Sequence, residues 1–273
     1  KMIEIKQKNR VRDWTESLLA SGRYSFALEE IVAAFPNMST GSLRPALQRL
    51  RVKGKISPVF RGYYLIIPPQ YSQMGILPPS MFMDQLMAHL GRWYYMGLLS
   101  AAGYHGASHQ SPQETFVMTG FPVMRDTLDK GLRIKYTSKE EPSEKHLIKV
   151  KTEAGYLQVS SVPLTLFDIV RYHQKCGGLN RVATVIAELA ESLQPGDFDD
   201  SLLLATKVSV IQRLGALFEA LGLNNNADEL YYRFSDLGLH MRSIPLNSAK
   251  PSSDSPVNKR WNVIMNTKIE PDI

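Results

Sequence analysis

Cysteine is almost absent from this chain, since Cys176 is the one cysteine among 273 residues. One cysteine can form neither an internal disulfide nor a multi-cysteine zinc site, and without an assignable base we interpret it as structural. This usage is typical of a reducing compartment, so we expect a cytoplasmic protein. No stretch approaches the roughly eighteen apolar residues that a membrane-spanning helix needs. No apolar h-region follows Lys1, so we also expect no signal peptide and no membrane partner.

Acidic residues are missing from one long segment. Between Ile31 and Met83 there is no Asp or Glu, whereas six basic residues fall within eighteen positions: Arg44, Arg49, Arg51, Lys53, Lys55 and Arg61. Residues 1–83 hold 12 Lys and Arg against 5 Asp and Glu, and residues 84–273 hold 20 against 21. A concentrated field of one sign attracts a polyanion. A solvated basic helix face gives the same pattern, so charge alone leaves both interpretations open.

The common motifs of catalysis are missing too. We find no Gly-rich phosphate loop and no Gly-x-Ser-x-Gly elbow. His105 and His109 have a metal-like spacing, but they lie in a Gly- and Ser-rich segment without a third ligand. Asp197, Asp199 and Asp200 lie between helical patterns, where capping of the next helix is the expected role. We therefore predict no catalytic residues, no metal and no cofactor, in a protein that is not an enzyme.

Residues 9–67 show the order of elements of a winged helix-turn-helix. Asn9, Ser25 and Ser39 or Thr40 are expected to begin three helices, the last ending at Gly54. Two β-rich runs, 56–60 and 63–67, are joined by Arg61-Gly62, which indicates a hairpin. The Gly- and Pro-bearing residues 72–79 are expected to be a linker. The predicted domains are therefore a winged helix-turn-helix over residues 1–71 and a second domain over residues 80–273.

The second domain is expected to be mixed. We predict a helix over residues 80–103, then strands at 114–120, 132–137, 146–152 and 156–159. Helices are expected from Pro163 and at 180–193, 201–221 and 226–237, with a last strand at 261–266 returning to the sheet. The predicted fold class is α+β: a winged helix-turn-helix, followed by a mixed domain with a small sheet and a C-terminal helical bundle.

The third helix divides its residues between two faces. Leu43, Leu47 and Leu50 form a core stripe, while Arg44, Gln48 and Arg51 are spaced i, i+4, i+7 on another face, with Ser42 and Arg49 expected nearby. Arg can bridge guanine O6 and N7, and Gln can bridge adenine N6 and N7, in the major groove. The helix N-terminus offers N–H groups and hydroxyls to a phosphate, and the basic residues of the wing would meet the neighbouring backbone. The predicted DNA-binding residues are Ser39, Thr40, Ser42, Arg44, Gln48, Arg49, Arg51, Lys53, Lys55 and Arg61.

A series of short motifs carries a resemblance to a known family. In order they are Leu98-Leu99-Ser100-Ala101-Ala102 with His105-Gly106, the run from Val162 to Val170, Gly177-Gly178-Leu179-Asn180-Arg181, Gln212-Arg213-Leu214-Gly215 and Arg260-Trp261-Asn262-Val263. Their order and spacing resemble the AbiEi-like antitoxins of abortive-infection, type IV toxin–antitoxin systems. The resemblance extends over nearly the whole chain.

This resemblance implies a sequence-specific repressor that binds inverted repeats in the promoter of its own operon. Inverted repeats are read by two copies, so self-association on double-stranded DNA is expected. The resemblance also implies that the C-terminal domain opposes a nucleotidyltransferase-type toxin, without requiring a stable complex with it.

Three alternatives remain open at this point. Winged helices also serve as protein-interaction modules. The chain could be a nucleic-acid-processing enzyme with a DNA-binding module, or a free-standing regulator that responds to a ligand. Lys145, Lys149 and Lys151 could form a second DNA-contacting patch, although solvated lysines give the same pattern.

Overall fold

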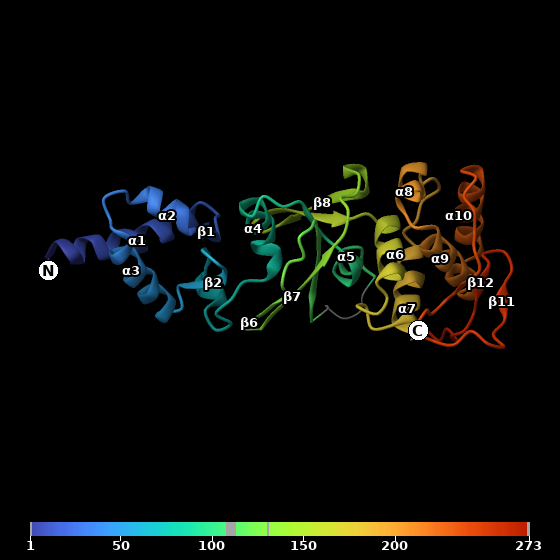
Figure 1. The fold of residues 1–273 in the computed structure, drawn as a ribbon. Coiled ribbons are helices and arrows are strands. Elements are labelled where there is room, and N and C mark those ends of the chain that lie inside the picture. The colour runs from blue at the N-terminus through green and yellow to red at the C-terminus, as the bar shows by residue number, and fades with distance from the viewer. Residues whose placement is uncertain (1, 108–112, 130, 272–273) are drawn as a thin grey trace. The chain divides into compact units, whose positions relative to one another are not determined.

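The computed structural model describes residues 2–107, 113–129 and 131–271, with side chains from Val11 onward within those ranges (Figure 1). Over these residues the chain forms ten α-helices and three β-sheets, which confirms the predicted mixture of α and β structure. Contacts divide the chain into two compact units. The first comprises Lys1–Tyr94, Thr119–Lys139 and Lys149–Gln158, and the second comprises Tyr95–Met118, Glu140–Ile148 and Val159–Ile273. The domain boundary at residues 72–79 stays a prediction.

The first unit begins with three helices and a small sheet. Its elements are α1 (Met2–Ala20), β1 (Ser25–Ala27), α2 (Leu28–Ala34), α3 (Thr40–Val52), β2 (Ile56–Phe60) and β3 (Tyr63–Ile66). The strands form an antiparallel sheet of order β1-β3-β2. The predicted hairpin is confirmed, and Gly62 in its turn has a φ of +75°, a conformation that glycine adopts at little cost. The helices and the sheet share one core: Val11, Phe26, Ile31, Leu43, Ala46, Leu47, Leu50, Ile56 and Ile66.

Two of the predicted helix starts were wrong. The first helix begins at Met2 rather than at Asn9, because residues 2–8 contain good helix formers and no Gly or Pro. Ser25 does not cap a helix, since it is the first residue of β1 and is fully buried. The second helix follows Ala27, whose backbone N–H donates to Oε1 of Glu30 at 3.0 Å. The carboxylate of Glu30 thus takes the capping role that we had expected of Ser25.

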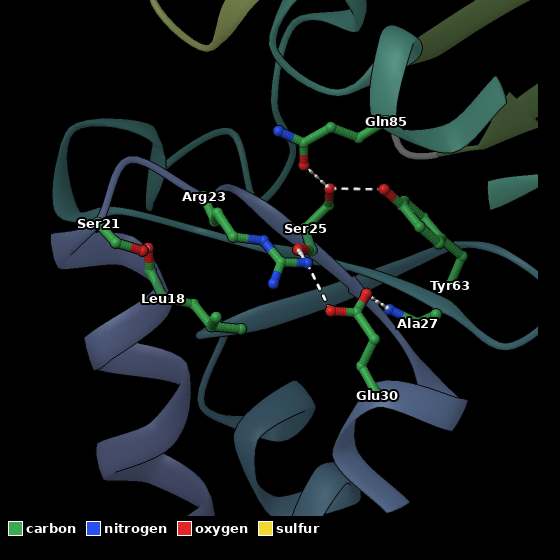
Figure 2. A network of polar contacts seen from close by, with 8 residues as sticks. All are labelled: Leu18, Ser21, Arg23, Ser25, Ala27, Glu30, Tyr63 and Gln85. Carbon is green, nitrogen blue, oxygen red and sulfur yellow. Dashed lines mark hydrogen bonds and ion pairs between the residues drawn. The ribbon is translucent and has the colours of Figure 1, made fainter. Parts of the chain in front are cut away.

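The buried hydroxyl of Ser25 ties β1 to β3 and to α4 (Met83–His89), as Figure 2 shows. It donates to Oε1 of Gln85 at 2.6 Å and lies 2.7 Å from the hydroxyl of Tyr63, which therefore donates to it. Burial raises the pKa of Tyr63, which keeps this phenol protonated. Beside this group, Arg23 pairs with Glu30 at 2.6 Å. The polar contacts thus link the small sheet to a helix beyond residue 79.

The predicted linker, residues 72–79, is partly buried. Its residues run from the end of the short 3₁₀ turn η1 (Pro69–Tyr71) to the first residue of η2 (Pro79–Met81), and they bury Ile76 and Leu77. Burial of two aliphatic side chains indicates a packed connection, because a freely moving linker would leave them in water.

The largest sheet has six strands. They are β4 (Tyr94–Met96), β5 (Thr115–Thr119), β6 (Thr127–Asp129), β7 (Leu132–Ser138), β8 (Leu147–Thr152) and β9 (Gly155–Ser160), in the order β6-β7-β5-β4-β9-β8. The predicted single helix over residues 80–103 was wrong, because β4 separates α4 from α5 (Leu98–Tyr104). Gly91, with a φ of +63°, follows the end of α4, and the aromatic residues Trp93, Tyr94 and Tyr95 then favour a strand.

Five helices of the second unit follow β9 along the chain (Figure 1): α6 (Val162–Arg171), α7 (Leu179–Ala190), α8 (Asp200–Ala205), α9 (Val208–Ala220) and α10 (Asn224–Asp236). The single helix predicted over residues 201–221 is interrupted at Thr206, whose backbone is extended. The last strand does not return to the six-stranded sheet. Instead β12 (Val263–Ile264) lies between β10 (Ile244–Pro245) and β11 (Val257–Asn258) in a sheet of its own.

The C-terminal segment is anchored on α9. The side-chain amide of Gln212 donates to the backbone oxygens of Arg242 at 2.8 Å and of Trp261 at 2.7 Å. Nε of Arg213 donates to the backbone oxygen of Pro245 at 3.1 Å. Gly215 faces the fully buried ring of Trp261, and any side chain at this position would overlap the ring. Two of the short sequence motifs, residues 212–215 and 260–263, thus hold the C-terminal segment against α9.

Candidate nucleic-acid interface

The third helix is fixed by its ends and by one buried stripe. Ser39 is its N-cap residue and its backbone oxygen accepts the first helical bonds, from Ser42 and Leu43. After the last turn, Gly54 adopts a φ of +64°, which stops the helix. The helix tolerates Pro45 in its second turn because the stripe of Leu43, Ala46, Leu47 and Leu50 is buried in the core.

The exposed surface of α3 has a crest and two flanks. Because an α-helix turns about 100° per residue, the line opposite the buried stripe passes through Gly41, Pro45, Gln48 and Val52, which we call the crest. One flank carries Thr40, Arg44 and Arg51, and the other carries Ser42 and Arg49. Arg44 and Arg49, the arginines nearest the crest on the two flanks, lie about 140° apart around the helix axis.

The structure exposes all ten residues that the sequence predicted for DNA binding. It brings Arg44, Gln48 and Arg51 to one side of the helix, as their spacing indicated. Arg49, which we expected beside them, lies on the other flank. Arginine side chains therefore border the crest on both sides.

The remaining basic residues continue past the helix. Lys53 is the C-cap residue of α3, Lys55 precedes β2, and Arg61 lies in the hairpin turn. Among the side chains that the structure describes, none of the six basic residues from Arg44 to Arg61 forms an ion pair. Their positive charges are therefore available to an external anion.

The N-terminus of α3 adds backbone donors to this surface. The N–H groups of Thr40 and Gly41 precede the first helical hydrogen bond, which runs from Ser42 to Ser39 at 2.9 Å. The hydroxyls of Ser39 and Ser42 lie 3.2 Å apart and are exposed. Backbone amides without a helical partner, with exposed hydroxyls beside them, are suited to a phosphate at a helix N-terminus.

Apart from Gly41, which has no side chain, the sequence reasoning missed two members of the crest, Pro45 and Val52. It selected charged and hydrogen-bonding side chains, and neither residue carries such a group. Val52 is 76% exposed. A helical projection from the core stripe would have placed both residues outward, because they lie at four- and eleven-residue spacings from Gly41.

The other candidate groups are occupied within the fold. Nε2 of His105 donates to the backbone oxygen of Ser160 at 2.7 Å, and His109 lies outside the described residues. Asp199 caps α8 by accepting from the N–H of Leu202 at 3.0 Å, which confirms the capping prediction for this residue. Burial raises the pKa of Cys176 to about 12, so its thiol stays protonated.

The three lysines of the predicted second patch do not share one environment. Lys145 pairs with Asp199 at 3.2 Å, whereas Lys149 and Lys151 are exposed on β8. The described residues contain no group of three His, Cys, Asp or Glu side chains placed to hold a metal ion. Within the same ranges, none of the helices has the length and apolar character needed to cross a bilayer.

Comparisons with known proteins bear on both parts of the chain. Residues 95–220 match the family model described as the AbiEi antitoxin C-terminal domain. The fold is similar to the crystal structure of the RV2827C protein from Mycobacterium tuberculosis, with a TM-score of 0.64 at 15% sequence identity. That likeness covers 92% of this chain and 89% of the other. No curated protein sequence matches the chain.

Proposed function

We propose that this protein is a sequence-specific DNA-binding repressor and the antitoxin of a type IV toxin–antitoxin system. The observation that carries the DNA-binding role is the exposed face of α3, which has arginines on both flanks and no acidic residue. The match of residues 95–220 to the AbiEi antitoxin C-terminal domain supports the antitoxin role.

The elements of residues 1–67 support a winged helix-turn-helix interpretation. In this interpretation α2 and α3 with the turn between them form the helix-turn-helix, and β2 and β3 form the wing. The recognition helix of such a motif lies in the major groove. With α3 in that position, Gln48 would meet base edges, while Arg44, Arg51 and Arg49 would reach phosphates on the two sides of the groove.

Binding to the DNA upstream of the protein's own gene tests this role. Affinity is measured for the full chain by fluorescence anisotropy over a salt series. Neutralising four to six phosphates should give a log–log slope of about −4 to −5. A flat salt response, or equal affinity for unrelated duplexes, would contradict the proposal.

A pair of variants locates the binding surface. Replacing Arg44 and Arg51 together with Ala should abolish specific binding, because it removes both arginines of one flank. The matched control replaces Lys149 and Lys151 with Ala, which removes the same charge from exposed positions on β8 and should leave affinity unchanged. Equal losses in both variants would indicate nonspecific attraction.

The antitoxin role has a separate test. We propose that the partner is a nucleotidyltransferase-type toxin encoded beside this gene, and that inverted repeats in the shared promoter are bound by two copies of this chain. Co-expression with that neighbour in bacteria should restore growth that the neighbour alone arrests. A neighbour of another class, or growth arrest that persists with the full chain present, would count against this role.

A further inference from the structure

The crest of α3 carries no charge, although basic side chains border it. Gly41 has no side chain, Pro45 presents a compact ring, and Val52 presents two methyl groups at 76% exposure. Gln48 is the one polar side chain among the four crest residues. Arg44 and Arg49 each lie about 70° from the centre line of the crest, and Arg51 lies about 90° from it.

This distribution of side chains determines what the helix would contact in the major groove. The crest faces the base pairs at the floor of the groove, and the flanks face its two phosphate walls. The two N-terminal crest residues are small, so the helix backbone can approach the bases closely. Because the arginines point toward the walls, they are poorly placed to bridge guanine O6 and N7 at the centre of the contact.

The chemistry of the crest matches one kind of base pair. A glutamine amide pairs with N6 and N7 of adenine through two hydrogen bonds. Apolar groups contact the C5-methyl group of thymine, which only thymine presents in unmodified DNA. Gln48 supplies the first contact, and Val52 with Pro45 supplies apolar surface for the second.

We propose that α3 reads adenine–thymine pairs at the centre of each half-site, through Gln48 on adenine and Val52 on a thymine methyl group. The inference rests on the proposed DNA-binding function and adds the bases that it reads. Duplex DNA is the occupant argued for the crest because the bordering surface is basic and free of acid from Ile31 to Met83.

The experiment begins with selection of bound duplexes from a random library by the full chain. The enriched half-site should contain adenine–thymine pairs at its most constrained positions. Each thymine is then replaced by deoxyuridine, which removes only the C5-methyl group. At one or two positions this should weaken binding about three- to fivefold, the loss expected for one buried methyl group.

The variant Val52→Ala connects this effect to its side chain. In Val52→Ala the deoxyuridine substitution should have little further effect, because the valine methyls that contacted the thymine are gone. The control Val123→Ala removes a valine of similar exposure, 69%, and should keep the full deoxyuridine effect. Gln48→Ala should reduce the preference for adenine at one position by about tenfold.

Two outcomes would overturn the inference while the proposed function stands. One is an enriched half-site with guanine–cytosine pairs at the constrained positions. The other is full affinity for every deoxyuridine duplex. Absence of any enriched sequence would instead contradict the DNA-binding function, and the inference would fall with it. Thermal denaturation of each variant confirms that these surface substitutions leave the fold intact.

Discussion

Gly215 shows how one residue can hold a whole segment in place. It lies in α9, where alanine would ordinarily favour the helix by about 1 kcal/mol. The ring of Trp261 occupies the space that a Cβ atom would need, and the ring is fully buried with no room to move aside. The absence of a side chain therefore allows the C-terminal segment to close on α9.

Gly215→Ala should lower the free energy of unfolding by about 1–3 kcal/mol, since overpacking outweighs the gain in helix propensity. Urea denaturation followed by tryptophan fluorescence measures the change. Gly41→Ala is the matched control, because its Cβ would meet only Oγ of Ser39 at 3.6 Å, an ordinary contact. A stability of Gly215→Ala equal to that of the wild type would show that Trp261 can be displaced without cost.

His146 gives the second unit a dependence on pH. Its Nε2 lies 3.0 Å from Oγ of Ser201 and 3.7 Å from Asp199, and Lys145 is its other charged neighbour. Burial lowers the pKa of His146, against the opposing attraction of Asp199. The unfolded chain therefore binds a proton at this residue more readily than the folded chain does.

Stability should consequently fall as the pH drops below about 6.5, the pKa of an unperturbed histidine, toward the lower pKa of the folded state. The folded protein is fully stabilised by this group above that range. Urea midpoints at pH 7.5 and 5.5 measure the loss, and His146→Gln should show a smaller difference between the two. An unchanged difference in the variant would assign the pH dependence to other groups.

At the scale of elements, patterns that are complete within one segment were predicted best. The third helix has its cap, its core stripe and its stop within sixteen residues, Ser39 to Gly54, and the structure places it there. The hairpin follows from two β-rich runs and Arg61-Gly62. The exposed positions of the ten candidate residues follow from the same local periodicity.

Elements that depend on distant partners were missed. The three residues of β1 form a strand because they pair with β3, and no three-residue pattern indicates this. The register of β4 beside β9 likewise depends on residues more than sixty positions away, Met96 and Val159. The two flanks of α3 required only helix geometry, but the sequence reasoning grouped Arg49 with Arg44 before applying it.

The basic residues after α3 should strengthen binding without choosing a sequence. Lys53→Ala and Arg61→Ala should each weaken specific and nonspecific duplexes alike, and each should reduce the salt slope by about 1. The same anisotropy titration on both duplexes measures this. A loss confined to the specific duplex would assign a base contact to that residue.

At the scale of the whole molecule, the net charge differs between the segment that we propose to bind DNA and the rest of the chain. The basic excess lies in residues 1–83, and residues 84–273 are close to neutral, with 20 basic and 21 acidic residues. A long-range attraction to DNA should therefore depend on the first of these segments.

The Arg44→Ala, Arg51→Ala double variant should lose repression of its promoter and keep the ability to restore growth beside the toxin. Reporter expression measures the first property and a growth assay measures the second. If the folded variant lost both properties, neutralisation of the toxin would depend on DNA binding. That result is expected if the antitoxin acts by repressing synthesis of the toxin.

The hydrogen bonds of Ser25 also bear on which N-terminal fragment of this protein is suited to separate study. A fragment that stops at residue 71 would lose Gln85, and the buried hydroxyl of Ser25 would lose the acceptor to which it donates. A fragment that continues through Gly91 keeps α4 and the contact between the rings of His89 and Tyr63, whose centroids lie 5.1 Å apart. The longer piece is the better starting point for crystallisation with an operator duplex or for assignment by NMR.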